Sequence, residues 1–219
     1  MNRRIFSHLL AVCISAALLP YAAFANAAEE APDLLIKRIS TEVLDSVKSD
    51  KSVQTGDMSK VIALVDGKII PHVNFTRMTA SAVGRSWRQA TPEQQKRLQE
   101  EFKTLLIRTY SGALAQVKDQ TVSLKPLRAG AAETEVVVRS EVIGRGDPIQ
   151  LDYRMEKTDT GWKIYDLNVL GVWLVETYRT QFAQEINAKG VDGLIASLSQ
   201  RNKSNATDKA SPTASEKKS

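Results

Sequence analysis

Histidine and cysteine, the side chains best suited to metal binding and nucleophilic catalysis, are almost absent from this chain. The sequence holds two histidines and one cysteine, and one of each lies in the N-terminal leader. The other histidine, His72, has no cysteine beside it, whereas a zinc site takes about three or four nitrogen or sulfur ligands. Serine hydrolases present their nucleophile on a G-x-S-x-G turn, and the sequence contains no such motif. We therefore expect no metal, no cofactor and no nucleophilic catalysis.

Carboxylates are the remaining groups that could perform acid–base chemistry. Residues 28–200 contain 23 of them, so some pair is always available for such a mechanism. Asp152 and Asp166 are the candidates because both occur in predicted strands. Asp152 falls on the polar side of its strand, where a solvated role is the simpler interpretation. Asp166 lies in a strand without clean alternation and is suited to accept a backbone hydrogen bond at the strand end.

A leader and a polar tail frame the body of the chain. Residues 1–27 carry two arginines, an apolar run and a small-x-small site ending at Ala27, which is the pattern of a removed signal peptide. The apolar run is shorter than the roughly 20 residues that a membrane anchor needs. A lipoprotein site at Cys13 is disfavoured by the bulky Val12 before it. Residues 201–219 are polar and lysine-rich without aromatics, which predicts a disordered tail.

The charge balance argues against a nucleic-acid partner. The whole chain has a formal charge of +5, but residues 28–200 hold 23 basic and 23 acidic side chains. Nucleic-acid binders concentrate basic charge on the folded body, and this body is neutral. With no internal repeat and no break in composition, residues 28–200 are predicted to form a single domain.

Helical patterns fill the first half of that domain. Asp33 is placed to cap a first helix and Asp57 a second, each with apolar residues at three- and four-residue spacing. Pro71 interrupts the second helix before a short third one that Gly84 ends. Residues 91–94 form a capping box that opens an amphipathic helix of about seven turns.

The pattern changes to a period of two after residue 120. Residues 134–142 and 149–156 alternate apolar and polar side chains across a glycine-rich turn, and residues 162–169 form a further strand. With residues 121–127 in front, the sequence predicts an antiparallel meander of about four strands with one apolar face.

Aromatic side chains are concentrated towards the end of the domain. A helix is predicted over residues 172–188, stopped by Gly190, and a last short helix follows it. The fold class is therefore α+β, with six to seven helices packed against one face of the sheet. The aromatic residues are Trp162, Tyr165, Trp173, Tyr178 and Phe182.

Seven short segments match a known pattern in order and spacing: residues 70–73 (IPHV), 86–95 (SWRQATPEQQ), Phe102, 110–114 (YSGAL), 161–166 (GWKIYD), 170–172 (LGV) and 189–194 (KGVDGL). Each segment is weak alone, but together they are specific. On these segments the chain resembles the MlaC family, also described as the toluene-tolerance family, over residues 31–200. One departure is Trp173, which stands where that family has a small residue and could narrow the mouth of a pocket.

The resemblance implies a phospholipid carrier of the periplasm rather than an enzyme, with neither cofactor nor metal. It implies a curved sheet that, with the helices, encloses an apolar pocket for the acyl chains. It also implies two protein partners in maintaining the lipid asymmetry of the outer membrane. One is an outer-membrane lipoprotein–porin complex, and the other is an inner-membrane ABC transporter contacted through its ring-forming periplasmic subunit.

The inward-facing positions of strands and helices are the expected walls of that pocket. Arg145 in the hairpin turn is a candidate headgroup contact, although a turn arginine is usually solvated. The expected lipid-binding residues are Phe75, Met78, Leu106, Tyr110, Val136, Val138, Leu151, Tyr153, Val169, Val172 and Val175.

Two other classes of protein stay open. A small periplasmic enzyme of isomerase or hydrolase type would use the same cavity and would need paired acid and base groups inside it. A structural periplasmic adaptor would use all of its apolar side chains as core and would have no cavity.

Overall fold

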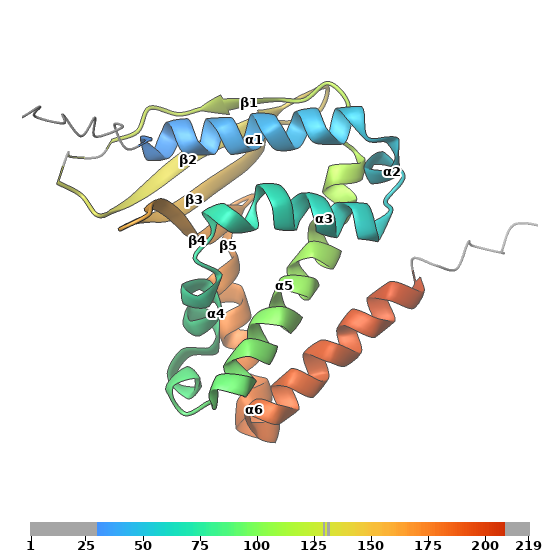
Figure 1. Cartoon of the computed structure of the whole chain (residues 1–219), viewed down its shortest axis with the longest axis vertical. Helices are drawn as coiled ribbons and strands as arrows, with labels where there is room; N and C mark the ends of the chain where they lie inside the picture. Colours follow the sequence, from blue (N-terminus) through green and yellow to red (C-terminus); the bar gives the residue numbers. More distant parts are fainter. Residues whose placement is uncertain (1–29, 129, 131, 209–219) are drawn as a thin grey trace, which may run out of the picture.

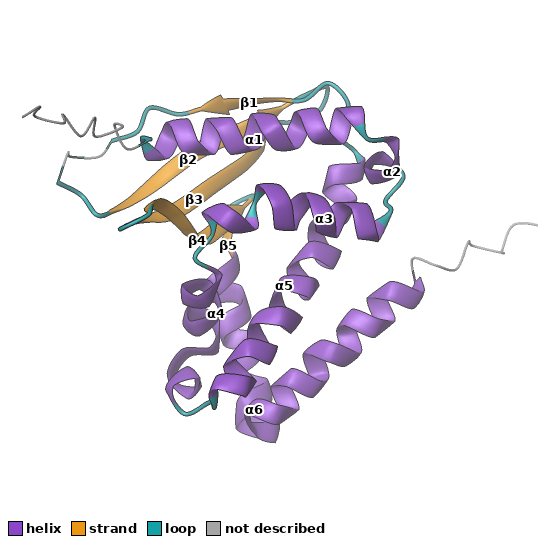
Figure 2. Cartoon of the chain, viewed as in Figure 1, coloured by secondary structure: helices purple, strands orange, loops and turns teal. Residues whose placement is uncertain are grey.

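The computed structural model describes residues 30–128, 130 and 132–208, which form an antiparallel sheet covered by helices. Figure 2 shows the strands gathered in one part of the molecule and most of the helices packed in front of and below them. The predicted α+β class is confirmed. The elements are α1 Pro32–Ser49, α2 Lys51–Gln54, α3 Met58–Lys68, α4 Phe75–Val83, α5 Pro92–Ala115, β1 Thr121–Leu124, β2 Glu135–Ile143, β3 Ile149–Thr158, β4 Gly161–Val169, β5 Val172–Trp173 and α6 Leu174–Asp208, with short 3-10 helices at Ile70–His72 and Gly84–Arg88.

The sheet is a meander in the order β1-β2-β3-β4-β5, all antiparallel. It has one strand more than predicted, because residues 172–173 pair with residues 168–169 as β5. Leu170 and Gly171 connect these strands with φ angles of 52° and 88°, and positive φ at both positions defines a type I′ hairpin turn. The helix predicted from residue 172 therefore begins at Leu174.

The register of the sheet places its apolar side chains on one face. Val138 lies opposite Tyr153, and Tyr153 lies opposite Leu167. The register of β3 against β4 shifts after Arg154, where Tyr165 remains as the extra residue of a β-bulge. This bulge explains why the sequence of β4 shows no clean alternation.

The predicted helix starts are confirmed for two of three helices. The carboxylate of Asp57 caps α3, and Thr91 and Gln94 form the capping box of α5. Asp33 does not cap α1. A proline at the first helical position starts this helix directly after Ala31, so Asp33 lies within the first turn, where its charge still favours the helix dipole.

Helix α6 consists of two helical parts joined at Gly190, whose backbone angles are φ 70° and ψ −176°. Figure 1 shows these parts running in different directions, with the second turning back past the lower end of α5. The predicted stop at Gly190 is therefore confirmed as a sharp kink. Within the described part of the chain, no helix combines the length and the apolar character that a membrane span requires.

The second part of α6 continues further than the sequence indicates. The prediction of disorder over residues 201–219 is wrong for residues 201–208, which are helical. Asn202 is 5% exposed, and its amide donates hydrogen bonds to the backbone carbonyl and the carboxylate of Glu101 on α5, at 3.0 and 2.7 Å. This contact secures a segment whose composition alone suggests disorder. Residues 209–219 and the predicted leader, residues 1–27, lie outside the described residues.

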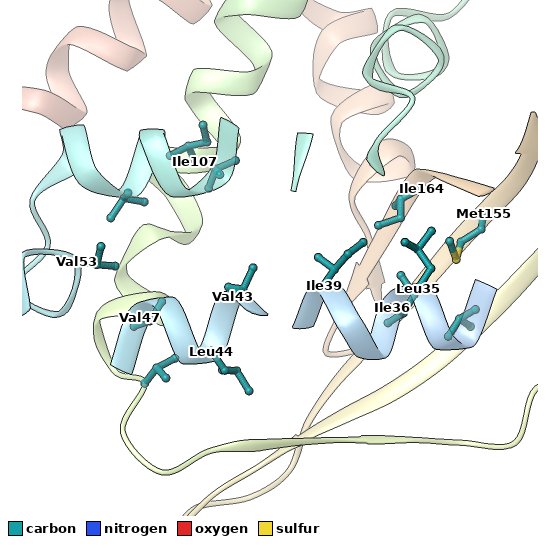
Figure 3. Close-up of a cluster of buried hydrophobic side chains, with 14 of the residues drawn as sticks. Leu35, Ile36, Ile39, Val43, Leu44, Val47, Val53, Ile107, Met155 and Ile164 are labelled. Carbon is teal, nitrogen blue, oxygen red and sulfur yellow. The ribbon is translucent and has the colours of Figure 1, made fainter. Parts of the chain in front are cut away.

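Two apolar clusters form the core. The first cluster joins α1, α2 and α3 to the sheet, and Figure 3 shows Leu35, Ile36 and Ile39 of α1 beside Met155 and Ile164 of the sheet. The second cluster joins α4, α5 and α6 beyond the last strands of the sheet. The first cluster therefore fixes α1, α2 and α3 to the sheet, and the second cluster packs α4, α5 and α6 against one another beside it.

The second cluster is centred on an aromatic ring that is fully buried. Phe102 of α5 is 0% exposed, and its ring centroid lies 4.9 Å from that of Tyr178 and 5.2 Å from that of Phe182, both on α6. Both ring pairs meet edge to face, a preferred aromatic geometry. Two of the five aromatic residues near the end of the domain, Tyr178 and Phe182, are thus core residues.

Candidate functional site

The side of the sheet that faces the helices, here called the inner face, is built from four cross-strand rows. The alternation of β2 and β3 predicts this face, and the register confirms it. Row one is Val136, Met155 and Ile164; row two is Val138, Tyr153 and Leu167; row three is Leu124, Ser140, Leu151, Val169 and Val172; row four is Val122, Val142 and Ile149.

Along β3 the exposure of the inner-face side chains increases from the first row to the last, whereas Val138 and Ser140 on β2 stay 1% exposed. Met155 in row one is 0% exposed, Tyr153 and Leu151 are half-buried, and Val172 and Ile149 are 51% and 41% exposed. A closed, close-packed core would keep such an apolar face covered to its end. The inner face therefore opens towards solvent at the end formed by the β2–β3 and β4–β5 turns.

Tyr153 lies deep in the protein and still has accessible surface. Burial raises the pKa of its hydroxyl, and hydrogen bonds with Ser140 and Ser40 oppose this effect only in part. Its side chain is half-buried and packs against the first apolar cluster. Tyr153 is therefore a candidate wall residue rather than a fully buried core residue.

Helix α5 contributes two further half-buried side chains that pack against the same cluster as the apolar positions of β4. Leu106 and Tyr110 of α5 are half-buried and pack against the same cluster as Leu167 and Val169 of β4. Burial also raises the pKa of Tyr110, so its hydroxyl is uncharged at neutral pH. Walls of this composition can accept an apolar guest and offer it few anchoring charges.

Burial divides the eleven expected pocket residues into three groups. Four are core residues at most 7% exposed: Met78, Val136, Val138 and Val175. Val172 is exposed at the open end of row three. The other six are half-buried and remain the candidates for pocket walls: Phe75, Leu106, Tyr110, Leu151, Tyr153 and Val169.

Leu167 belongs with these six and is missed by the sequence pattern. It is half-buried in row two, opposite Tyr153. The bulge at Tyr165 shifts the alternation of β4 by one residue, so counting in twos along the whole strand assigns the wrong face to part of it. The register after the bulge is the signal that finds Leu167.

Asp166 lies on the opposite, outer face and connects three elements. It is 1% exposed and accepts hydrogen bonds from the backbone N–H of Leu167 at 2.8 Å and of Val175 at 3.0 Å. Its other oxygen pairs with Arg154 at 2.9 Å. Burial raises the pKa of Asp166, and these partners counteract the rise. The prediction that Asp166 accepts a backbone hydrogen bond is confirmed.

Asp152 also lies on the outer face, as predicted, but it is not solvated. It is 6% exposed and accepts a hydrogen bond from the amide of Gln150 at 2.8 Å. The prediction of a solvated residue is wrong because β3 is a central strand, and Asp152 has Arg139 in register on one side and Asn168 on the other. Both candidate acid–base residues thus lie on the outer face.

Trp173 does not narrow the open end of the inner face. Its register partner is Asn168, so it belongs to the outer face, and the guanidinium of Arg154 lies 3.9 Å from its ring centroid. Val172, its neighbour, takes the inner side. The departure from the family pattern therefore adds a cation–π contact on the outer face and does not obstruct the inner face.

The polar residues near the turns have local structural roles. Arg145 in the β2–β3 turn pairs with Asp119 at 3.2 Å, and its side chain is 92% exposed. His72 is half-buried in a 3-10 helix, where burial lowers its pKa and keeps the imidazole neutral. The described residues contain no group of three or more His, Cys, Asp or Glu side chains able to hold a metal ion.

A solved structure with this architecture comes from Ralstonia solanacearum. It is a phospholipid-binding protein in complex with a phospholipid, with a TM-score of 0.78 and 51% sequence identity, covering 80% of this chain and 98% of that one. An α+β protein with a graded apolar inner face thus has the fold of a protein solved with bound lipid.

The family assignment follows from the sequence comparison. The family model described as MlaC protein matches residues 37–200, and the chain belongs to this family. The toluene tolerance protein ttg2D of Pseudomonas putida is 25% identical over 166 residues, covering 75% of this chain and 77% of that protein. The intermembrane phospholipid transport system binding protein MlaC of Haemophilus influenzae is 22% identical over 177 residues, covering 79% and 83%.

Proposed function

We propose that the protein is a periplasmic carrier that binds a phospholipid by its acyl chains and shuttles it between membrane complexes. The observation that carries this proposal is the graded inner face, which is buried at Met155 and open at Ile149 and Val172. The phospholipid bound by the Ralstonia protein supports the same class of ligand. Family membership supports a role in transport.

Acyl chains need almost complete shelter from water. Burial of each CH₂ group is worth about 0.8 kcal/mol, so two chains of roughly 15 methylenes gain about 24 kcal/mol in a hollow. The half-buried side chains of the inner face and of α5 are placed to provide that shelter. In this arrangement the headgroup stays in solvent at the open end, where Arg145 is its candidate contact.

The proposal includes the location and the partners of the carrier. Residues 1–27 would direct export to the periplasm and would then be removed. There the carrier would exchange its lipid with an outer-membrane lipoprotein–porin complex. It would also exchange lipid with an inner-membrane ABC transporter through the ring-forming periplasmic subunit, and so maintain the asymmetry of the outer membrane.

A catalytic use of the same space has less support. An isomerase or hydrolase would need an acid and a base facing the guest. Asp152 and Asp166 lie on the outer face, and the four inner-face rows contain hydroxyl groups, at Ser140 and Tyr153, but no carboxylate among the described residues. The Ser140 hydroxyl is engaged in a hydrogen bond to the carbonyl of Leu151 at 2.9 Å, and these rows offer no carboxylate or imidazole as its base.

Filling the hollow tests the proposal. Val169→Phe adds volume at a half-buried position, and the matched control Val138→Phe adds the same volume at a position 1% exposed. Extra volume in a packed core costs about 1–3 kcal/mol, so the control should lose stability. We expect Val169→Phe to keep its free energy of unfolding in urea and to co-purify with less phospholipid, measured by native mass spectrometry. If it is destabilised as much as the control and still carries its lipid, the inner face is closed core and the pocket assignment is wrong.

A further inference from the structure

Four aliphatic side chains gather at the end of the sheet formed by the β2–β3 and β4–β5 turns, and we call them the mouth rim. Ile149 and Val172 lie on the inner face, whereas Ile143 follows Val142 and lies on the outer face. Five large hydrophobic residues are exposed in the described chain, and four of them lie at this end. Ile149 starts β3 next to the end of β2, and the N–H of Leu170 donates to the carbonyl of Gln150 at 3.1 Å, which holds the two turns together. The rim residues are Ile143 (41% exposed), Ile149 (41%), Leu170 (64%) and Val172 (51%).

The backbone conformation at Leu170 indicates that the stability of the fold does not explain why a leucine occupies this position. Its φ of 52° makes it the only non-glycine residue with positive φ in the described chain. Leucine is disfavoured in that conformation, whereas Asn and Gly adopt it readily. A leucine that is both disfavoured by the backbone and 64% exposed gains nothing from the domain itself. Its side chain is better explained by a contact outside the protein.

We propose that the mouth rim docks on the surface of a lipid bilayer and enters the boundary between headgroups and acyl chains. This inference rests on the proposed lipid-carrier function. Val172 lies opposite Val169, which lies opposite Leu151, so the apolar inner face continues without interruption to the rim. An acyl chain leaving the hollow at a docked rim would pass directly into hydrocarbon.

The composition of the rim favours a bilayer over a protein partner. Protein interfaces concentrate their binding energy in Trp, Tyr and Arg, whereas the rim is purely aliphatic. Beside it, the Arg145 side chain is 92% exposed and is restrained by one solvent-exposed ion pair with Asp119. Such a pair contributes little and can exchange for a lipid phosphate. The same turn also carries the exposed Asp147, so the charge beside the rim is mixed. The aliphatic composition of the rim, with Arg145 as one phosphate contact, is what matches a membrane surface.

Vesicle sedimentation with the mature full-length chain tests the docking. The rim variant is Leu170→Asn with Val172→Thr, since Asn suits the positive φ and Thr keeps a β-branched strand residue. The matched control is Leu34→Gln, which removes a side chain 55% exposed on α1. Near the other end of α1, Lys48 donates a hydrogen bond to the carbonyl of Gln120, close to the open end of the sheet. Leu34 lies about 21 Å from Lys48 along the helix, at 1.5 Å per residue, so the control position is far from the rim. The vesicles contain phosphatidylethanolamine and phosphatidylglycerol and no protein.

We expect the rim variant to bind these vesicles about tenfold more weakly than the wild type, with the thermal midpoint not lowered and the control unaffected. Wild-type protein that does not sediment with protein-free vesicles would overturn the inference and leave the rim to a protein partner. Equal binding by the rim variant would also overturn it. Native mass spectrometry of the same samples separates the carrier function from the docking of the rim. A protein that contains bound phospholipid but does not bind vesicles would contradict the docking and still support the carrier function.

Discussion

Asp166 joins β3, β4 and α6 through a single buried carboxylate, and its titration should be visible in the stability of the whole domain. Burial raises its pKa, so the folded-state value lies above the unfolded one. Such a group contributes stability that is present below its unfolded pKa and is lost as pH rises through its folded pKa. We expect the stability advantage of the wild type over Asp166→Asn, measured by urea denaturation, to be larger at about pH 4 than at about pH 7.

Glu135 provides a control with the opposite sign. Its hydrogen bond with Arg77 lowers its pKa, so its contribution is present above the unfolded pKa and is lost as pH falls through the folded value. The advantage of the wild type over Glu135→Gln should therefore decrease towards acid. Two variants with the same pH slope would contradict the assignment of Asp166.

Residue roles are predictable from sequence where their cause is local. A carboxylate at a strand end next to a helix start is placed to accept backbone N–H groups, and Asp166 does so. The burial of Asp152 has a different cause, since it depends on the neighbours that pairing brings beside a central strand. Local alternation assigns its face correctly but carries no information about those neighbours.

At the scale of elements, the capping box of α5 should have a measurable effect. Thr91 accepts from the N–H of Gln94 at 3.2 Å, and the Gln94 side chain accepts from the N–H of Thr91 at 2.9 Å. Loss of such a cap costs about 1 kcal/mol, so Thr91→Ala should lower the free energy of unfolding by about that amount. Thr104→Ala inside the same helix is the control and should be near neutral or stabilising, because alanine is the better helix former. Equal losses in both variants would show that the cap is not the cause.

The kink of α6 depends on a backbone conformation that only glycine adopts easily. Gly190 has φ 70° and ψ −176°, and a side chain there costs about 1–3 kcal/mol even though space is available. We expect Gly190→Ala to lower the thermal midpoint. Gly112→Ala in α5, where a Cβ would also meet no neighbour, should raise it, since alanine in a helix interior is favoured by about 1 kcal/mol. A neutral Gly190→Ala would mean that the two parts of α6 can join in another way.

Helix ends and turns are the elements that the sequence predicts best, because caps, prolines and glycines act within a few residues. The bulge at Tyr165 and the short strand β5 depend on pairing between strands and leave little local trace. The helical residues 201–208 depend on the contact between Asn202 and Glu101, about a hundred positions apart in the chain. Composition therefore predicts disorder where a distant partner gives order.

For the whole molecule, the arrangement of two clusters explains why the candidate site is only partly predictable. Alternation identifies the inner face and most of its residues. Alternation does not predict how deeply each of these residues is buried. Val138 is packed beneath α1, whereas Leu151, in the third row of the inner face, remains half-buried. That difference arises because the first cluster closes over one end of the sheet and the second cluster closes only the region beyond it. The depth of each position is a property of the assembled domain.

Native mass spectrometry of the protein purified from the periplasm, followed by lipid extraction, tests the carrier function most directly. The proposed pocket, with apolar walls and one open end, should hold about one phospholipid per chain, with mixed headgroups because the headgroup would remain in solvent. The extracted lipid should be chemically intact, since a carrier does not alter its cargo. A protein that is purified without lipid and takes up none from liposomes would contradict the account.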